Sequence, residues 1–369
     1  MRVLAVSTWL PTPDRPSTGT FVMKDAHAIA SLGHQVLLVH LVPPHQGAGL
    51  PPQGELEGLP VVRIPMATTS PRQVLAARRA LTGLVRRCDL LHTMAFSSLL
   101  PFAGRRPDRP WVHTDHWSGL TTPASLPLTW RVALPALLPL LRGPDVATAV
   151  VERLAAPIRR VRGTRPTVVV PCVVPAPPGG PPARPEADGT IDLVDVGGLV
   201  EGKDPVLAVD VVAELVSRGR PARLRLVGDG PLADAVRARA AERGLGEAVT
   251  LVGTLDRAGV LAELARADIF LGPTRSDNFY VSAAEAVVSG RPVVAGANGG
   301  HAEYLPPEVS RLVPVQDAGA YADAVEDLLT ATASWTAEQV AATLGDRFEP
   351  ERVAASYQEA YDLALGTAR

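Results

Sequence analysis

The chain has few of the residues that build small covalent or metal frameworks. Only two cysteines, Cys88 and Cys172, occur among its 369 residues, which excludes a disulfide framework and multi-thiolate zinc or iron–sulfur sites. Aromatic residues make up 4% of the chain. They do not interleave with basic residues, so we expect no nucleic-acid partner.

Long hydrophobic runs are also missing. The longest, residues 132–141, contains two prolines and is much shorter than the ~20 residues that span a bilayer. Met1 and Arg2 lead directly into a strand-like segment, so we expect no signal peptide. These absences predict a soluble, cytoplasmic protein without membrane insertion.

Lysine is nearly absent, because Lys24 and Lys203 are the only two. Charge is unevenly distributed: residues 1–180 hold 19 basic and 9 acidic side chains, and residues 181–369 hold 17 basic and 29 acidic ones. Such asymmetry indicates either two domains with different ligands or complementary charged faces.

A length of 369 residues with 46% apolar residues predicts two folded domains. Short β-branched runs alternate with amphipathic stretches on both sides of a Pro/Gly-rich segment. The predicted strands are residues 3–7, 35–42, 191–196, 224–227, 249–252, 269–271 and 293–295, and the predicted helices are residues 21–32, 205–216 and 280–289.

This alternation is typical of parallel sheets with helical crossovers, here twice over. We therefore expect an α/β protein with two Rossmann-like, doubly wound domains whose strands' carboxyl ends face a cleft. The expected boundaries are listed in order: a first domain at 1–174, a linker at 175–188, a second domain at 189–345 and terminal helices at 346–369.

Residues 273–294 hold the densest group of candidate functional side chains in the chain. Asp277 precedes the helix predicted at 280–289, and Glu285 lies eight positions later within it. A carboxylate on a partly apolar helix face needs polar partners, such as ribose or sugar hydroxyls. The N–H groups of residues 279–282 would lie at a helix N-terminus and suit phosphate oxygens. Alternatively, Asp277 only caps the helix and Glu285 is a surface residue.

The same segment resembles the signature of the retaining glycosyltransferases of family 4 (glycosyl transferases group 1), which have the GT-B fold. Asp277-Asn278-Phe279 and Glu285-Ala286, followed by Gly290-Arg291-Pro292-Val293-Val294, match in register, with aspartate in place of the first glutamate. The resemblance implies that Asp277 approaches the donor sugar and Glu285 the ribose of the nucleotide. It assigns the rest of the donor loop to Asn278, Phe279, Tyr280, Val281 and Ser282.

Residues 196–204 resemble the family segment whose arginine and lysine hold the donor diphosphate. Lys203 is present, but Gly198 occupies the position of the arginine. Arg275 is the nearest cation in sequence that could replace it, or it is an ordinary surface arginine. The resemblance further implies donor contacts by Gly300 and His301, although a structural histidine is equally compatible with the pattern.

In the first half, the loop at residues 17–20 resembles the family's glycine loop against the donor phosphates, with Gly19 as the central residue. His116 aligns with a family histidine that projects towards the sugar. His113 and Asp115 precede it closely and raise the alternative of a metal site, but no further ligand lies at a suitable spacing. We expect no metal and no cofactor.

Residues 126–141 are rich in leucine and proline. They suit a helix lining an acceptor pocket, a peripheral membrane contact, or a buried helix pair interrupted by prolines, which is the interpretation we favour. The final helices resemble those that, in the family, cross back to the first domain.

The resemblance implies a metal-independent, retaining transferase with a nucleotide-diphosphate sugar as donor. The N-terminal domain would bind the acceptor, and the donor base, the sugar, the acceptor and the oligomeric state stay open. A sugar-nucleotide 2-epimerase and a nucleotide-sugar-binding relative with weak catalysis remain alternatives. A dinucleotide-dependent dehydrogenase is excluded because residues 7–11 lack the glycines it needs after the first strand.

Overall fold

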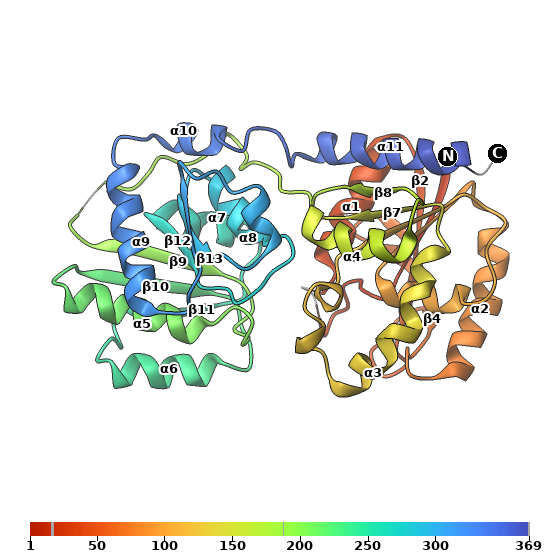
Figure 1. Cartoon of the computed structure of the whole chain (residues 1–369), viewed down its shortest axis with the longest axis horizontal. Coiled ribbons are helices and arrows are strands. Elements are labelled where there is room, and N and C mark those ends of the chain that lie inside the picture. The colour runs from red at the N-terminus through yellow and green to blue at the C-terminus, as the bar shows by residue number, and fades with distance from the viewer. Residues whose placement is uncertain (16–17, 187, 368–369) are drawn as a thin grey trace. The chain divides into compact units, whose positions relative to one another are not determined.

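The computed structural model describes residues 1–15, 18–186 and 188–367. The chain forms two units (Figure 1). Unit 1 comprises Met1–Val173 together with the chain from Glu349 onwards, and unit 2 comprises Val174–Phe348. The chain therefore leaves unit 1, builds unit 2, and returns to unit 1.

Unit 1 contains a sheet in the order β3-β4-β2-β1-β5-β6-β7-β8, which is parallel except for the β3–β4 hairpin. Its strands are β1 (Arg2–Ser7), β2 (Gln35–Val42), β3 (Gln53–Leu56), β4 (Leu59–Pro65), β5 (Leu90–Met94), β6 (Trp111–Asp115), β7 (Val146–Ala149) and β8 (Thr167–Val169). The strand order changes direction between β1 and β5. In a doubly wound sheet, this switch point leaves a crevice at the carboxyl ends of the strands.

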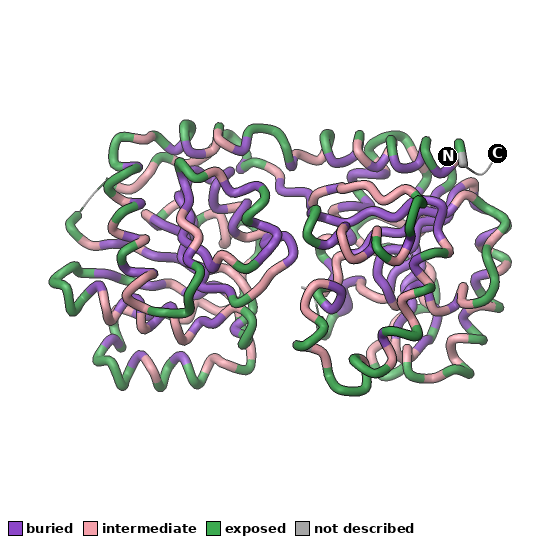
Figure 2. Tube along the Cα trace, viewed as in Figure 1, coloured by how far each residue is buried: buried purple, intermediate pink, exposed green. Residues whose placement is uncertain are grey.

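Helices cover the two faces of this sheet (Figure 1). They are α1 (Thr20–Ser31), α2 (Pro71–Val85), α3 (Leu128–Leu137), α4 (Glu152–Arg162) and α11 (Pro350–Thr367), with 3-10 turns η1 (Phe96–Phe102), η2 (Ser118–Leu120), η3 (Pro123–Ser125) and η4 (Leu138–Arg142). The central strands are buried, and the outer helix faces are exposed (Figure 2).

The C-terminal helix α11 is an integral part of unit 1. It packs against α1, β6 and β7, and its residues Val353, Tyr357 and Tyr361 are fully buried. These apolar residues recur every four positions and therefore form one face of the helix. The Tyr361 hydroxyl is hydrogen-bonded to His92 Nδ1 at 2.8 Å. Residues 368 and 369 of the expected terminal segment lie outside the described chain.

Unit 2 contains a fully parallel sheet in the order β11-β10-β9-β12-β13-β14. The strands are β9 (Ile191–Val196), β10 (Ala222–Val227), β11 (Val249–Gly253), β12 (Ile269–Gly272), β13 (Val293–Gly296) and β14 (Ser310–Val313). The helices are α5 (Pro205–Ser217), α6 (Ala233–Glu242), α7 (Arg257–Arg266), α8 (Val281–Val288), α9 (Ala318–Ala331) and α10 (Ala337–Ala342), with the 3-10 turn η5 (Gly300–Glu303). The predicted fold class is confirmed, and the switch point lies between β9 and β12.

The proline-rich segment expected to be a linker is attached to unit 2. Arg257 donates hydrogen bonds to the carbonyls of Pro175 and Ala176. The buried guanidinium of Arg291 donates to those of Pro182 and Ala183. A proline-rich segment forms neither a helix nor a sheet ladder, so its carbonyls need other donors, and these arginines supply them. Residue 187 of the expected linker lies outside the described chain.

The favoured interpretation of residues 126–141 as a buried helix pair is wrong. The helices are present as α3 and η4, but Leu128 is 72% exposed and Val132 is 73% exposed. Within α3, only Leu134 is buried. No element of the described chain covers the outer face of α3. The apolar residues of this helix are therefore exposed although its composition predicted burial. None of the helices in the described residues is long and apolar enough to cross a membrane.

Candidate functional site

The candidate site of unit 2 lies where β9 and β12 end, at the switch point of the sheet. The loop after β9 carries Lys203, and the loop after β12 carries Asp277. Two hydrogen bonds to the carbonyl of Gly202 hold the loops together, from the Arg275 N–H at 2.9 Å and the Thr274 hydroxyl at 3.0 Å. Two segments more than 70 residues apart in sequence thus meet at the position where α/β sheets bind ligands.

Lys203 and Asp277 form an ion pair in this site. The Lys203 Nζ donates to Asp277 Oδ2 at 2.7 Å, and both side chains are mostly buried. Asp277 Oδ1 also accepts a 2.6 Å hydrogen bond from the N–H of Tyr280. Burial alone would raise the pKa of Asp277, but the Lys203 ammonium and these hydrogen bonds hold it below its usual value. One oxygen of Asp277 therefore closes the turn that leads into α8, and the other binds the lysine.

The ring of Tyr280 packs against the ammonium of Lys203. The ring centroid lies 3.5 Å from Lys203 Nζ, a cation–π contact, and the residue is 1% exposed. Tyr280 adopts a left-handed conformation with φ of 62°, and so does Asp204 with φ of 50°. Left-handed conformations are strained for residues other than glycine, and they gather at functional sites. Two of the four such residues in the described chain flank Lys203.

Asp195 is a buried carboxyl beside the lysine that the sequence prediction missed. It lies on β9, is 4% exposed, and its Oδ1 has no hydrogen-bond partner in the described part of the chain. Burial raises its pKa to about 7, although the nearby Lys203 charge acts in the opposite direction. The available signal was the second of the two acidic residues, Asp192 and Asp195, in a predicted strand that is otherwise apolar.

Arg275, the nearest candidate for the missing arginine, is already paired with a carboxylate, and its contact with the donor stays a prediction. Its guanidinium forms a 2.7 Å ion pair with Asp204 and is 52% exposed. Asp204 begins α5, as its sequence predicts, but its side chain makes no capping hydrogen bond. Gly198 is exposed, and a Cβ there would meet only Val200 and the Asp229 carbonyl, at 3.7 and 3.8 Å. The position of the family arginine thus has room for a side chain.

The remaining donor-loop residues divide into two groups. Asn278 and Phe279 are buried, and Phe279 stacks on Tyr304 with ring centroids 4.8 Å apart. Val281, Ser282 and Glu285 are half-buried on α8. The first N–H groups of a helix have no partner within it. Val281 and Ser282 therefore offer such backbone N–H groups at the N-terminal end of α8, next to Asp277.

Gly300 and His301 belong to η5, which also contacts Asp277. The Gly300 N–H donates to the Asp277 carbonyl at 3.0 Å. His301 is fully buried, and its Nε2 is 2.6 Å from the Gly296 carbonyl oxygen. A Cβ at Gly299 would overlap the His301 ring and the Asp277 carbonyl, so this turn requires glycine. His301 has a structural hydrogen bond here.

In unit 1, the loop after β1 leads to Gly19, which begins α1. Gly19 has a φ of 73°, and a Cβ there would overlap the carbonyl of Trp9. Only glycine allows this close approach of two backbone segments. Thr18 is described, but Ser17 of the predicted loop lies outside the described residues. The role of Gly19 towards a phosphate stays a prediction.

His116 lies directly after β6 and is paired with a buried carboxylate. Its Nε2 is 3.1 Å from Asp25 Oδ2, and the two side chains are 7% and 1% exposed. Phe21 packs on the imidazole with ring centroids 4.4 Å apart. The pairing fixes the orientation of the ring, and the sugar contact implied for His116 remains a prediction.

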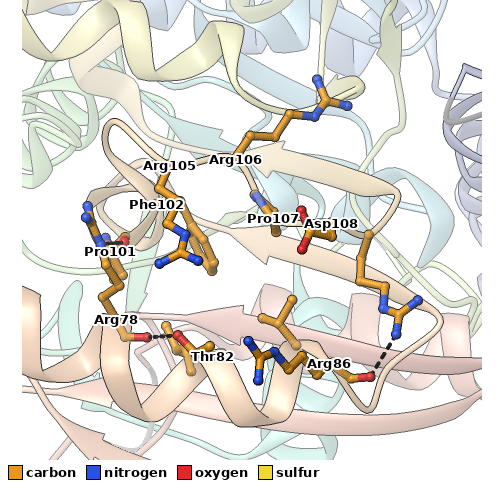
Figure 3. A pocket seen from close by; sticks show the side chains of 12 residues that line it. Arg78, Thr82, Arg86, Pro101, Phe102, Arg105, Arg106, Pro107 and Asp108 are labelled. Atoms are coloured by element: carbon orange, nitrogen blue, oxygen red, sulfur yellow. Dashed lines mark hydrogen bonds between the residues drawn. The ribbon is translucent and has the colours of Figure 1, made fainter.

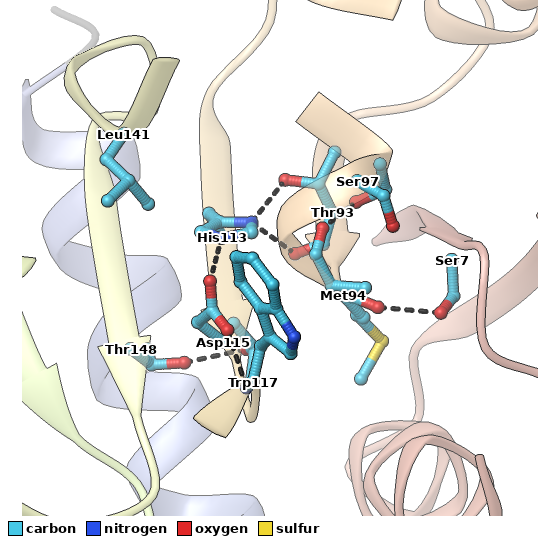
Figure 4. A network of polar contacts seen from close by, with 12 residues as sticks. Ser7, Thr93, Met94, Ser97, His113, Asp115, Trp117, Leu141 and Thr148 are labelled. Atoms are coloured by element: carbon cyan, nitrogen blue, oxygen red, sulfur yellow. Dashed lines mark hydrogen bonds and ion pairs between the residues drawn. The ribbon is translucent and has the colours of Figure 1, made fainter. Parts of the chain in front are cut away.

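The possible metal ligands near His116 form an internal network instead (Figure 4). His113 Nδ1 lies 3.0 Å from the Thr93 carbonyl oxygen, and its Nε2 lies 3.4 Å from Asp115 Oδ2. Asp115 Oδ1 accepts a 2.7 Å hydrogen bond from the N–H of Trp117. His113 and Asp115 are fully buried. Among the residues that the structure describes, no three histidine, cysteine or acidic side chains are grouped to hold a metal.

Solved structures resemble this chain over its full length. Sucrose-phosphate synthase from Thermosynechococcus elongatus matches with a TM-score of 0.77 at 21% identity, covering 100% of both chains. HepE of Anabaena in complex with UDP matches with a TM-score of 0.74 at 16% identity, also covering 100% of both chains. At these identities the likeness concerns the fold, which is GT-B.

The two parallel sheets and the site at the end of β9 and β12 define a GT-B-type glycosyltransferase architecture. The family model "Glycosyltransferase Family 4" matches residues 18–176, and "Glycosyl transferases group 1" matches residues 191–331. The chain belongs to glycosyltransferase family 4.

Curated relatives share shorter regions. The 2-deoxystreptamine glucosyltransferase of Streptomyces kanamyceticus is 35% identical over 105 residues, or 28% of this chain and 27% of the relative. The GDP-mannose-dependent alpha-(1-6)-phosphatidylinositol dimannoside mannosyltransferase of Mycobacterium tuberculosis is 32% identical over 132 residues, or 36% of this chain and 31% of the relative. The chain thus spans about a third of the length of these relatives.

Proposed function

We propose that the chain transfers a sugar from a nucleotide-diphosphate sugar to a hydroxyl acceptor, with retention of the anomeric configuration and without a metal ion. The observation that carries this proposal is the Lys203–Asp277 ion pair at the switch point of unit 2. It combines a cation for a leaving diphosphate with a carboxylate for sugar hydroxyls.

Lys203 stabilises the charge that develops on the departing diphosphate. The mostly buried ammonium is held by Asp277 and the Tyr280 ring, so little reorganisation is needed when charge appears. The N–H groups at the start of α8 add hydrogen-bond donors for the phosphate oxygens. The ammonium and these N–H groups take the place of a metal ion in the proposed reaction.

The reaction proceeds on one face of the sugar. The bond between the anomeric carbon and the phosphate oxygen breaks while the acceptor oxygen bonds to the same carbon. The proton of the acceptor hydroxyl passes to the departing phosphate oxygen. Asp277 orients the sugar, Glu285 binds the ribose hydroxyls, and the protein contributes chiefly position and charge stabilisation. The sugar contact implied for His116 stays a prediction.

A polyhydroxylated ring is the acceptor class that we propose. The names of three relatives refer to 2-deoxystreptamine, a phosphatidylinositol dimannoside and D-inositol 3-phosphate, all of which contain a cyclitol. Such acceptors occur in natural products and surface glycolipids. Unit 1 would bind them.

A binding protein with weak catalysis is the second candidate. It is favoured by Gly198, which leaves Lys203 as the cation of the proposed diphosphate clamp, and by the shorter carboxylate of Asp277. The two candidates differ in turnover rather than in donor affinity.

Calorimetric titration with UDP, GDP and ADP tests the donor site, with the Glu285→Gln variant as a probe of the ribose contact. We expect micromolar binding of one nucleotide and a clear loss of affinity in the variant. Product formation with the matching nucleotide sugar and a cyclitol acceptor then separates the transferase from the binding protein. Activity abolished by EDTA and restored by Mg²⁺ would contradict the metal-independent reaction.

A further inference from the structure

A second pocket lies in unit 1, away from the carboxyl ends of its strands. It is formed by the C-terminal half of α2, the end of η1 and the loop that leads into β6, and it encloses about 770 Å³ of space that is partly open to solvent (Figure 3). Because α2 ends just before β5 begins, the pocket lies at the amino ends of β5 and β6. Gly19 and His116 follow the carboxyl ends of strands.

Five arginines line this pocket: Arg78, Arg86, Arg105, Arg106 and Arg109. The single acidic side chain in its lining is Asp108. Its floor is apolar and includes the buried Leu81 and Val85 together with the half-buried Phe102. A hollow with an apolar floor and several convergent cationic groups is the usual form of a site for an anionic small molecule.

Three of the five guanidinium groups already have partners. Arg78 donates to the carbonyls of Pro101 and Ala103. Arg106 pairs with the carboxylate of Asp145 and points away from the hollow in Figure 3. These contacts fasten the loop after η1 and leave the shape of the pocket well defined.

Arg109 donates to the Arg86 carbonyl at 2.8 Å, and this contact connects the loop to the end of α2. The guanidinium groups of Arg86 and Arg105 form neither an ion pair nor a side-chain hydrogen bond with any residue that the structure describes. Both side chains are exposed and reach into the hollow (Figure 3). They are the groups available to a ligand.

We propose that this pocket binds a small phosphorylated molecule, with its phosphate groups held by Arg86 and Arg105 and its apolar part against Leu81, Val85 and Phe102. Arginine suits this role because its planar fork of N–H donors matches two phosphate oxygens at once. An anion would also reduce the repulsion among like charges around one hollow. The proposal does not depend on the function proposed for unit 2.

Calorimetric titration of the full chain with inorganic pyrophosphate tests this proposal. The titrations use the Lys203→Ala background, so that the donor site proposed in unit 2 contributes little heat. The test variant carries Arg86→Gln and Arg105→Gln. The control carries Arg79→Gln and Arg87→Gln, which removes two exposed arginines near the same segment but outside the pocket lining.

We expect the test variant to bind pyrophosphate at least about tenfold more weakly, as lost charge-assisted hydrogen bonds do, and the control to bind within about twofold of its parent. Hydrogen exchange should show pyrophosphate protecting residues 103–109 in the parent and control but not in the test variant. Equal weakening in both variants would overturn the proposal, because only diffuse charge would then be involved.

Vesicles of phosphatidylcholine, with and without phosphatidic acid, provide the second arm. We expect the test and control variants to sediment with them to the same extent. If the pocket variant loses vesicle binding while pyrophosphate does not bind the parent, the arginines bind a membrane surface and the small-ligand proposal is wrong.

Discussion

At the scale of single residues, Lys203 is the centre of the candidate donor site. It is one of two lysines in the chain. Its ammonium forms an ion pair with Asp277, contacts the Tyr280 ring and interacts electrostatically with the buried Asp195. Such a concentration of contacts around one cation is unusual for a surface ion pair, which contributes little. It is expected where a charge must be held in place for a ligand.

Lys203→Ala should lower turnover by about 10²–10³-fold, the usual effect of losing a preorganised group that stabilises transition-state charge. The measurement is the initial rate of sugar transfer at saturating acceptor. Arg220→Ala removes an exposed cation from the same unit and should leave the rate unchanged. Near-normal turnover of the lysine variant would mean that other groups hold the phosphates.

Gly198→Arg should raise donor affinity, because the position is exposed and a side chain there meets only ordinary contacts. Arg275 is paired with Asp204, so the new guanidinium would be the second cation near the diphosphate. Calorimetry with the preferred nucleotide measures the change. Unchanged affinity, with unchanged thermal stability, would show that the family arginine has no counterpart position in this loop.

At the scale of elements, β9 combines a packing role with a titrating group. Asp195 lies in the strand β9, in which the preceding residues Leu193 and Val194 are fully buried. Its carboxyl has a pKa of about 7 in the folded chain, raised mainly by burial, against about 3.9 for an exposed aspartate. Its protonated form is thus favoured in the fold.

This pKa shift predicts that Asp195 lowers stability as the pH rises. The unfolded chain loses the Asp195 proton near pH 4, and the folded chain loses it near pH 7. The free energy of unfolding therefore falls as the pH rises between these two values. Asp195→Asn keeps the shape and removes the titration. The melting temperature of the variant relative to the parent should therefore be at least about 5 °C higher at pH 8 than at pH 5. A difference independent of pH would contradict the assignment.

At the scale of the whole molecule, the two units carry buried groups that respond to acid in opposite ways. Burial lowers the pKa of His92 to about 3 and that of His40 to about 4, with smaller contributions from neighbouring positive groups. Both lie in the sheet of unit 1. An unfolded histidine takes up a proton near pH 6.5, so acid favours the unfolded form of unit 1.

Lowering the pH from 7 to 5 should therefore reduce the stability of unit 1 more than that of unit 2, where Asp195 has the opposite effect. Hydrogen exchange, corrected for the pH dependence of intrinsic rates, can follow this element by element. We expect the amides of β5 to lose protection relative to those of β9. Equal changes in the two strands would show that the chain opens as one cooperative unit.

Much of the local structure could be predicted from the sequence. The strands at residues 35–42 and 191–196 have the predicted bounds, and α8 begins one residue after the position predicted for it. These features depend on side-chain alternation and on glycine and proline signals, which act over a few residues. The alternation of strands and helices in turn predicted the doubly wound fold class.

The sequence by itself therefore determined part of the strands and helices, the fold class and the family resemblance around Asp277 and Lys203. Only the tertiary structure decided the strand order that brings the loops after β9 and β12 together, and it buried Asp195 beside the lysine. It also left α3 exposed, attached the proline segment to unit 2 and returned α11 to unit 1. The reason is physical: periodicity reports which side of an element is apolar, whereas burial and pairing depend on which distant segment covers that side.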